Sequence, residues 1–84
     1  MEIKMTYMWQ EQRGEMLFRF QTDEPIVAEK MRRRVKFILT GQGMNCKIWI
    51  YIASFYSPQK ARGALAQLTS RKVNKDCYED VYYA

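Results

Sequence analysis

The stretch that decides the fold runs from residue 46 to residue 70 and reads CKIWIYIASFYSPQKARGALAQLTS. Its first part, residues 46–55, is rich in β-branched and aromatic side chains, which is typical of a strand. Ser57 and Pro58 then supply an N-cap residue and a proline at the first position of a helix. Ala61, Leu65 and Leu68 recur at helical spacing, so we expect a helix from residue 58 to about residue 70.

The first half of the chain has a similar arrangement. Residues 2–10 and 16–21 both alternate between two sets of side chains, and the turn at 11–14 between them predicts a hairpin. Residues 22–25, Thr-Asp-Glu-Pro, predict the start of a helix that continues to about residue 34. A β-rich run at 35–39, broken by glycines before the run at 46–55, predicts a second hairpin. The alternation from residue 77 to 83 predicts a last strand.

The sequence therefore predicts one small basic α+β domain over residues 1–84, with the order ββαββαβ. We expect a single-layer antiparallel sheet with both helices on one face, ferredoxin-like (split βαβ) from residue 15, plus an extra N-terminal strand. Tandem ββα repeats with another sheet order are the alternative. The expected core is Phe18, Phe20, Phe37, Ile48, Ile50, Leu65 and Leu68.

The order over residues 15–83 resembles that of the RNA-recognition motif. This resemblance is confined to topology, because residues 47–52, KIWIYI, lack the glycine of that family's RNP1 segment. No residue role follows from it.

The charge is divided sharply along the chain. The net charge is +5, yet residues 30–75 hold eleven Lys or Arg and no Asp or Glu, whereas residues 1–29 and 76–84 each sum to −3. Like charges gathered in one region create a field that attracts polyanions. The central region is therefore the part of the chain in which we expect a partner to bind.

Several function classes are disfavoured by composition. The chain has no histidine, so we do not expect an enzyme. Cys46 and Cys77 are too few for a disulfide framework or a structural zinc site, and we expect reduced thiols, no metal and no small-molecule cofactor. No apolar run reaches the roughly 20 residues that span a bilayer, and the first residues do not resemble a signal peptide. We expect a cytoplasmic protein without a membrane partner.

Two features suggest nucleic acid as the partner, DNA or RNA. One is the basic run Lys30, Arg32, Arg33, Arg34 and Lys36. The other is the strand at 47–52: if its isoleucines face the helices, its remaining side chains form a basic and aromatic stripe suited to single strands. We expect Arg19 and Lys36, from the neighbouring segments, on the same outer face of the sheet. The predicted nucleic-acid-binding residues are thus Lys30, Arg32, Arg33, Arg34, Lys36, Lys47, Trp49 and Tyr51. The alternative is a protein-interaction or homodimerisation module, in which a second copy or another protein covers the aromatic stripe.

Overall fold

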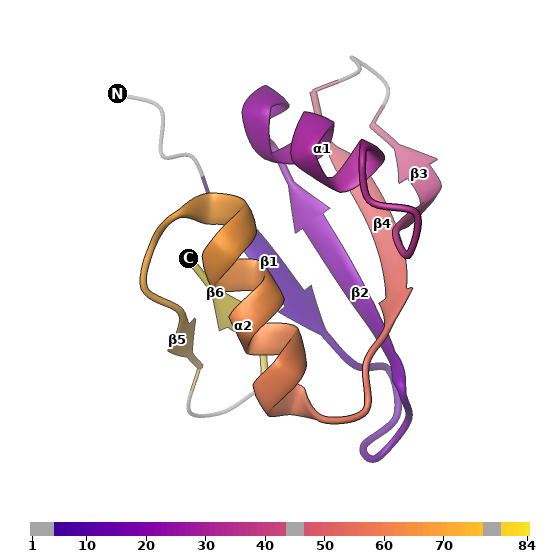
Figure 1. The fold of residues 1–84 in the computed structure, drawn as a ribbon, viewed down its shortest axis with the longest axis vertical. Coiled ribbons are helices and arrows are strands. Elements are labelled where there is room, and N and C mark those ends of the chain that lie inside the picture. The colour runs from indigo at the N-terminus through magenta and orange to yellow at the C-terminus, as the bar shows by residue number, and fades with distance from the viewer. Residues whose placement is uncertain (1–4, 44–46, 77–79) are drawn as a thin grey trace.

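A computed structural model of the chain describes residues 5–43, 47–76 and 80–84, which form one sheet and two helices (Figure 1). The elements, in chain order, are β1 (Thr6–Trp9), β2 (Leu17–Thr22), α1 (Pro25–Arg32), β3 (Ile38–Gln42), β4 (Trp49–Ser54), α2 (Pro58–Thr69), β5 (Asn74–Lys75) and β6 (Tyr82–Tyr83). The sheet order is β3-β4-β2-β1-β6-β5, and every pair of neighbouring strands is antiparallel. Both helices cover the same face, so the predicted α+β class is confirmed.

The ferredoxin-like order is matched only in part. In that fold the last strand pairs with the first strand of the βαββαβ unit, which here is β2. In this protein β1 pairs with β2 instead, and β6 pairs with β1 on the far side. The extra N-terminal strand thus lies inside the sheet. β2 also pairs with β4, so two successive ββα units meet through their second strands.

Several element boundaries differ from the predicted ones. α1 ends at Arg32, because residues 33–37 form a turn in which the Arg34 amide donates to the carbonyl of Met31. β3 therefore begins at Ile38 and continues past Gly41, with an irregularity between Leu39 and Gly41. The predicted last strand is reduced to β6, and β5 was not predicted. Residues 77–79 of that strand, with Cys77, lie outside the described residues, as does Cys46.

The two helices begin differently. At α2 the Ser57 hydroxyl accepts a hydrogen bond from the Lys60 amide at 3.3 Å, which confirms the predicted N-cap. At α1 the cap residue is Glu24, whose side chain makes no cap hydrogen bond. Its buried carboxylate instead accepts from the Thr6 hydroxyl at 2.7 Å and from both terminal nitrogens of Arg71. Glu24 thus links the start of α1 to β1 through Thr6, and to the segment directly after α2 through Arg71.

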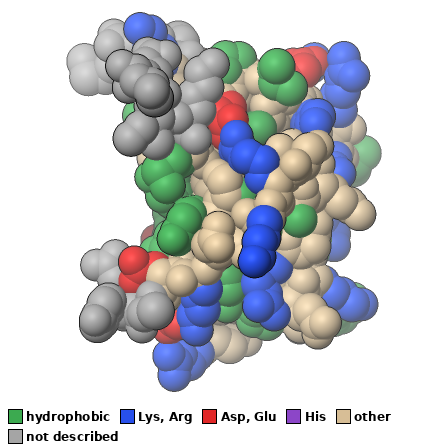
Figure 2. Space-filling model, turned by 90° about the vertical axis from the view of Figure 1, so that its left-hand side faces the viewer, with side chains coloured by type: hydrophobic (Ala, Val, Ile, Leu, Met, Phe, Trp, Pro, Cys, Tyr) green, Lys and Arg blue, Asp and Glu red, His purple; other side chains and the backbone are tan. Residues whose placement is uncertain are grey.

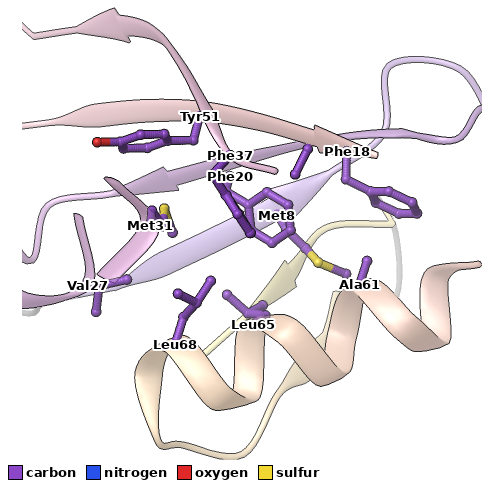
Figure 3. Packing of buried hydrophobic residues seen from close by; sticks show 11 residues of the cluster. Met8, Phe18, Phe20, Val27, Met31, Phe37, Tyr51, Ala61, Leu65 and Leu68 are labelled. Atoms are coloured by element: carbon purple, nitrogen blue, oxygen red, sulfur yellow. The ribbon is translucent and has the colours of Figure 1, made fainter. Parts of the chain in front are cut away.

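The core lies between the sheet and the helices (Figure 3). Five of the predicted core residues are buried there: Phe18, Phe20, Phe37, Leu65 and Leu68. The prediction is wrong for Ile48, which is 40% exposed, and for Ile50, which is half-buried on the opposite side of the sheet.

β4 thus presents the opposite face to the one predicted. Its Tyr51 and Ala53 are 4% and 2% exposed beneath the helices, and Trp49 packs against the same core. The cause is the register with β2, which pairs Phe20 with Tyr51 and Phe18 with Ala53. Residues paired across antiparallel strands point to the same face, so the buried phenylalanines bring the aromatic side of β4 inward.

The other side of the sheet carries no helix, and we call it the open face (Figure 1). By strand register its side chains include Tyr7, Trp9, Leu17, Arg19, Gln21, Ile38, Ile50, Ile52 and Tyr83. Arg19 was expected on this face, and its placement is confirmed. The opposite surface, formed by α1, the turn at 33–37, the loop at 55–57 and α2, we call the helical side.

Candidate nucleic-acid interface

The basic run at 30–36 divides into two groups. Arg32 and Arg33, at the end of α1, both bind Glu29, with Arg32 Nε 3.0 Å from Oε2 and Arg33 Nε 3.3 Å from Oε1. The hydrogen bond from Arg32 lowers the pKa of the Glu29 carboxyl, with further lowering from the positive charges, and the same hydrogen bond raises the pKa of Arg32. Glu29 therefore offsets part of the positive charge at this end of the helix.

The second group has no carboxylate beside it among the described residues. Lys30 is exposed on α1, and Arg34 is partly exposed in the turn that follows. Lys36 lies on the helical side, because its Nζ is 4.3 Å from the centroid of the Phe55 ring. An ammonium over a ring keeps its full charge and can still meet an anion. The expectation that Lys36 lies on the outer sheet face with Arg19 is therefore wrong.

The remaining predicted site residues do not form one stripe. Lys47 is exposed just before β4, at the hairpin end of the sheet. Trp49 and Tyr51 face the helices and the core, so the predicted aromatic stripe is absent from the open face. The Tyr51 ring is 4% exposed, which leaves no room for a base to stack on it.

Sequence reasoning missed the exposed aromatic ring of Tyr56. It immediately precedes the N-cap of α2 and is 81% exposed. Lys60, four residues further on, places its Nζ 5.4 Å from the centroid of this ring, and Lys36 lies over the adjacent Phe55. An aromatic residue just before a helix, with a lysine four positions later, is a signal that could have found the pair, because such spacing brings the side chains together.

The carboxylates of the chain are distributed unevenly over its surface. Five of those in the described residues form ion pairs, and they hold six arginines and lysines. Among the described cations, those that make no ion pair with a described carboxylate are Lys30, Arg34, Lys36, Lys47, Lys60, Arg62 and Lys72. All of them lie between residues 30 and 72. Figure 2 shows Lys and Arg side chains over α2 and the surface beside it, with few acidic side chains between them.

A basic cluster elsewhere provides a contrast. Arg13 and Lys75 each lie 2.9 Å from an oxygen of Asp80, beside a pocket of about 610 Å³ that Tyr82 also lines. A hydrogen bond from Lys75 lowers the pKa of Asp80, and a second hydrogen bond from Arg13 lowers it further. Both cations are thus paired with Asp80, so less unbalanced positive charge is available to bind an anion at this pocket than on the helical side.

The described residues contain no group of three His, Cys, Asp or Glu side chains placed to hold a metal ion. Neither helix they form has the length and apolar character needed to cross a membrane. No protein-family description, curated protein or solved structure matches this chain.

Proposed function

We propose that this protein binds single-stranded nucleic acid through its helical side. The observation that carries the proposal is the distribution of charge: across the described residues, the cations without a carboxylate partner all lie at 30–72, and most of them are on α1, the turn after it, and α2. Cations whose charge is not already balanced release the counterions that phosphates have condensed, and this release drives binding.

The position of Tyr56 supports a single strand rather than a duplex. This residue is 81% exposed, and Lys60 lies beside its ring. In a duplex the base faces are stacked inside the helix, whereas a single strand can place a base against an exposed ring while cations follow its backbone. We assign the stacking role to Tyr56, and Lys36 and Lys60 would contact the phosphates on either side.

Trp49 and Tyr51 are not part of this proposal, because both face the core. Arg32 and Arg33 contribute less than the other cations, since Glu29 already binds them. The proposed contacts are Lys30, Arg34, Lys36, Lys60 and Tyr56, with Lys47, Arg62 and Lys72 extending the positive field.

The test is the salt dependence of binding to fluorescently labelled single-stranded DNA and RNA of equal length, followed by anisotropy. With about four or five phosphate contacts, the slope of log affinity against log salt should be roughly −3 to −3.5 on single strands. Lys36→Gln should weaken binding and make the slope shallower by about 0.7, the value of one contact.

The matched control is Arg13→Gln, which changes the net charge by the same amount at a position paired with Asp80. It should leave the slope unchanged. Equal effects of the two substitutions would show that net charge alone attracts the strand. Absence of binding even at low salt would contradict the proposal and would favour an acidic protein as the partner of the helical side.

A further inference from the structure

The open face has a composition that is unusual for a surface in contact with water. Its side chains come mainly from Tyr7, Trp9, Leu17, Ile50, Ile52 and Tyr83, each of which is partly exposed. Ile38, which pairs with Ile52 in the ladder, is 60% exposed. On β2, Arg19 and Gln21 lie between the apolar residues of β4 and those of β1, so two apolar areas flank a short polar strip. Monomeric proteins rarely leave large apolar areas uncovered, because their contact with water is unfavourable.

Charge is nearly absent from this face. Among the described strand positions that point outward, Arg19 is the only charged residue. Its guanidinium lies 3.4 Å from Glu11 and 3.6 Å from Glu15, both in the segment that joins β1 to β2. The one cation at these described positions is therefore balanced by carboxylates, and the open face is poorly suited to a polyanion.

We infer that the open face is the interface between two copies of this chain, paired sheet against sheet. An apolar sheet face can pack against an identical face, as the two sheets of a β-sandwich do about 10 Å apart. Such pairing also places the two helical sides on opposite surfaces of the dimer. Two chains that each carry +5 thus keep their cationic surfaces far apart, whereas pairing through the helical sides would bring those cations together.

The available area suits a stable dimer. The Cα atoms of the whole molecule extend 32 and 29 Å across the view of Figure 1, in which the helices lie in front of the sheet. These extents set an upper limit on the size of the open face, and a standard interface of about 800 Å² on each partner fits within that limit.

The edge of β3 is a less suitable place for a second copy. A strand edge recruits another strand only where its backbone groups form a regular ladder. The ladder of β3 is interrupted between Leu39 and Gly41, and such irregularities discourage edge pairing. The sheet face, not the edge, is therefore the surface that we assign to the dimer.

The test is the mass of the full chain in solution, measured by light scattering after size exclusion and by analytical ultracentrifugation. The wild-type chain should have twice the mass of 10.1 kDa, with a dissociation constant of about 1 μM or lower. Ile52→Lys should reduce the mass to that of one chain. Its control is Val35→Lys, which adds the same charge at a residue that is 99% exposed in the turn after α1 and should remain dimeric.

A monomeric wild-type chain at micromolar concentrations would overturn the inference, and this result does not depend on any variant folding. Trp9→Lys provides a second disruption, and circular dichroism of each variant verifies that it is folded. A folded Ile52→Lys or Trp9→Lys chain that remains a dimer would also overturn the inference, because the copies would then meet elsewhere. The inference stands apart from nucleic-acid binding, which is measured separately.

Discussion

The two surfaces of this molecule differ in charge and in apolar character. In the part of the chain that the structure describes, the helical side carries cations that make no ion pair with a described carboxylate, and it carries the exposed Tyr56. The open face carries isoleucines and aromatic residues, and Arg19 brings its own carboxylate partners. A charged surface whose charge is unbalanced is suited to a polyanion, whereas an uncharged apolar face is suited to burial against another protein.

This difference has its origin within single strands. In β4, residues 49–52 carry large side chains on both faces, yet Trp49 and Tyr51 pack beneath the helices while Ile50 and Ile52 are left on the open face. The strand must be covered on both sides to keep its apolar residues from water. The helices cover one side, and a second copy is our proposal for the other.

The largest expected effect is on stability, and it compares the two faces directly. Tyr51→Ala should lower the free energy of unfolding by about 3–5 kcal/mol, since it leaves a cavity beneath the helices. Ile52→Ala, one residue along, should cost about 1 kcal/mol at low protein concentration, because this side chain is only partly buried in one chain. Urea denaturation at two protein concentrations measures both. Equal losses at the lower concentration would mean that the two faces are not different.

A smaller loss of stability is expected where the two helices are joined. Arg71→Met should cost about 1–3 kcal/mol, because it leaves the buried carboxylate of Glu24 with fewer donors. Arg13→Met removes an ion pair from a side chain that is 89% exposed and should change stability little, because water screens such a pair. Thermal melts of the two variants provide the comparison, and a larger loss for Arg13→Met would contradict it.

Removal of the exposed ring on the helical side should weaken binding of single strands. Tyr56→Ala should reduce affinity by about 1–3 kcal/mol and leave the salt slope unchanged, because stacking releases no counterions. Tyr56→Phe keeps the ring and should bind nearly as well as the wild-type chain. If anisotropy showed the same affinity for Tyr56→Ala as for the wild-type chain, the stacking role would be wrong.

The smallest effect is a gain of binding. A glutamate carboxyl is charged at neutral pH, and the hydrogen bond from Arg32 lowers the pKa of Glu29 further, so both Arg32 and Arg33 remain paired with it as the pH falls toward its ordinary pKa. Glu29→Gln should release them and make the salt slope steeper by about 0.7 for each arginine that reaches a phosphate. Asp80→Asn removes the same charge beside Arg13 and should leave the slope nearly unchanged. A slope that steepens equally in both variants would argue against a localised interface.

The sequence was sufficient to predict the parts of the fold that depend on local signals. The start of α2 at Ser57 and Pro58 follows from helix-capping preferences. The burial of Leu65 and Leu68 follows from their helical spacing. The buried face of β2 follows as well, because Phe18 and Phe20 alternate with more polar residues.

The features that were missed depend on which strands pair and in which register. β4 alternates between isoleucines and aromatic residues, so its pattern gives no difference in polarity to decide which face is buried. The register of β4 with β2 determines which face of β4 is buried. Two other missed features also join residues distant in sequence. One is the position of β1 between β2 and β6, and the other is the ion pair of Glu24 with Arg71. Within the candidate site, the basic run was found from composition, whereas Tyr56 appeared only as a residue before a helix cap.

The measurement that tests the central claim most directly is a titration of the ¹⁵N-labelled chain with a short single-stranded oligonucleotide, followed by amide chemical shifts. The account predicts shifts at Lys36, Tyr56 and Lys60 on the helical side and unchanged amides at Ile50 and Tyr83 on the open face. Shifts concentrated on the open face, with the helical side unaffected, would contradict it.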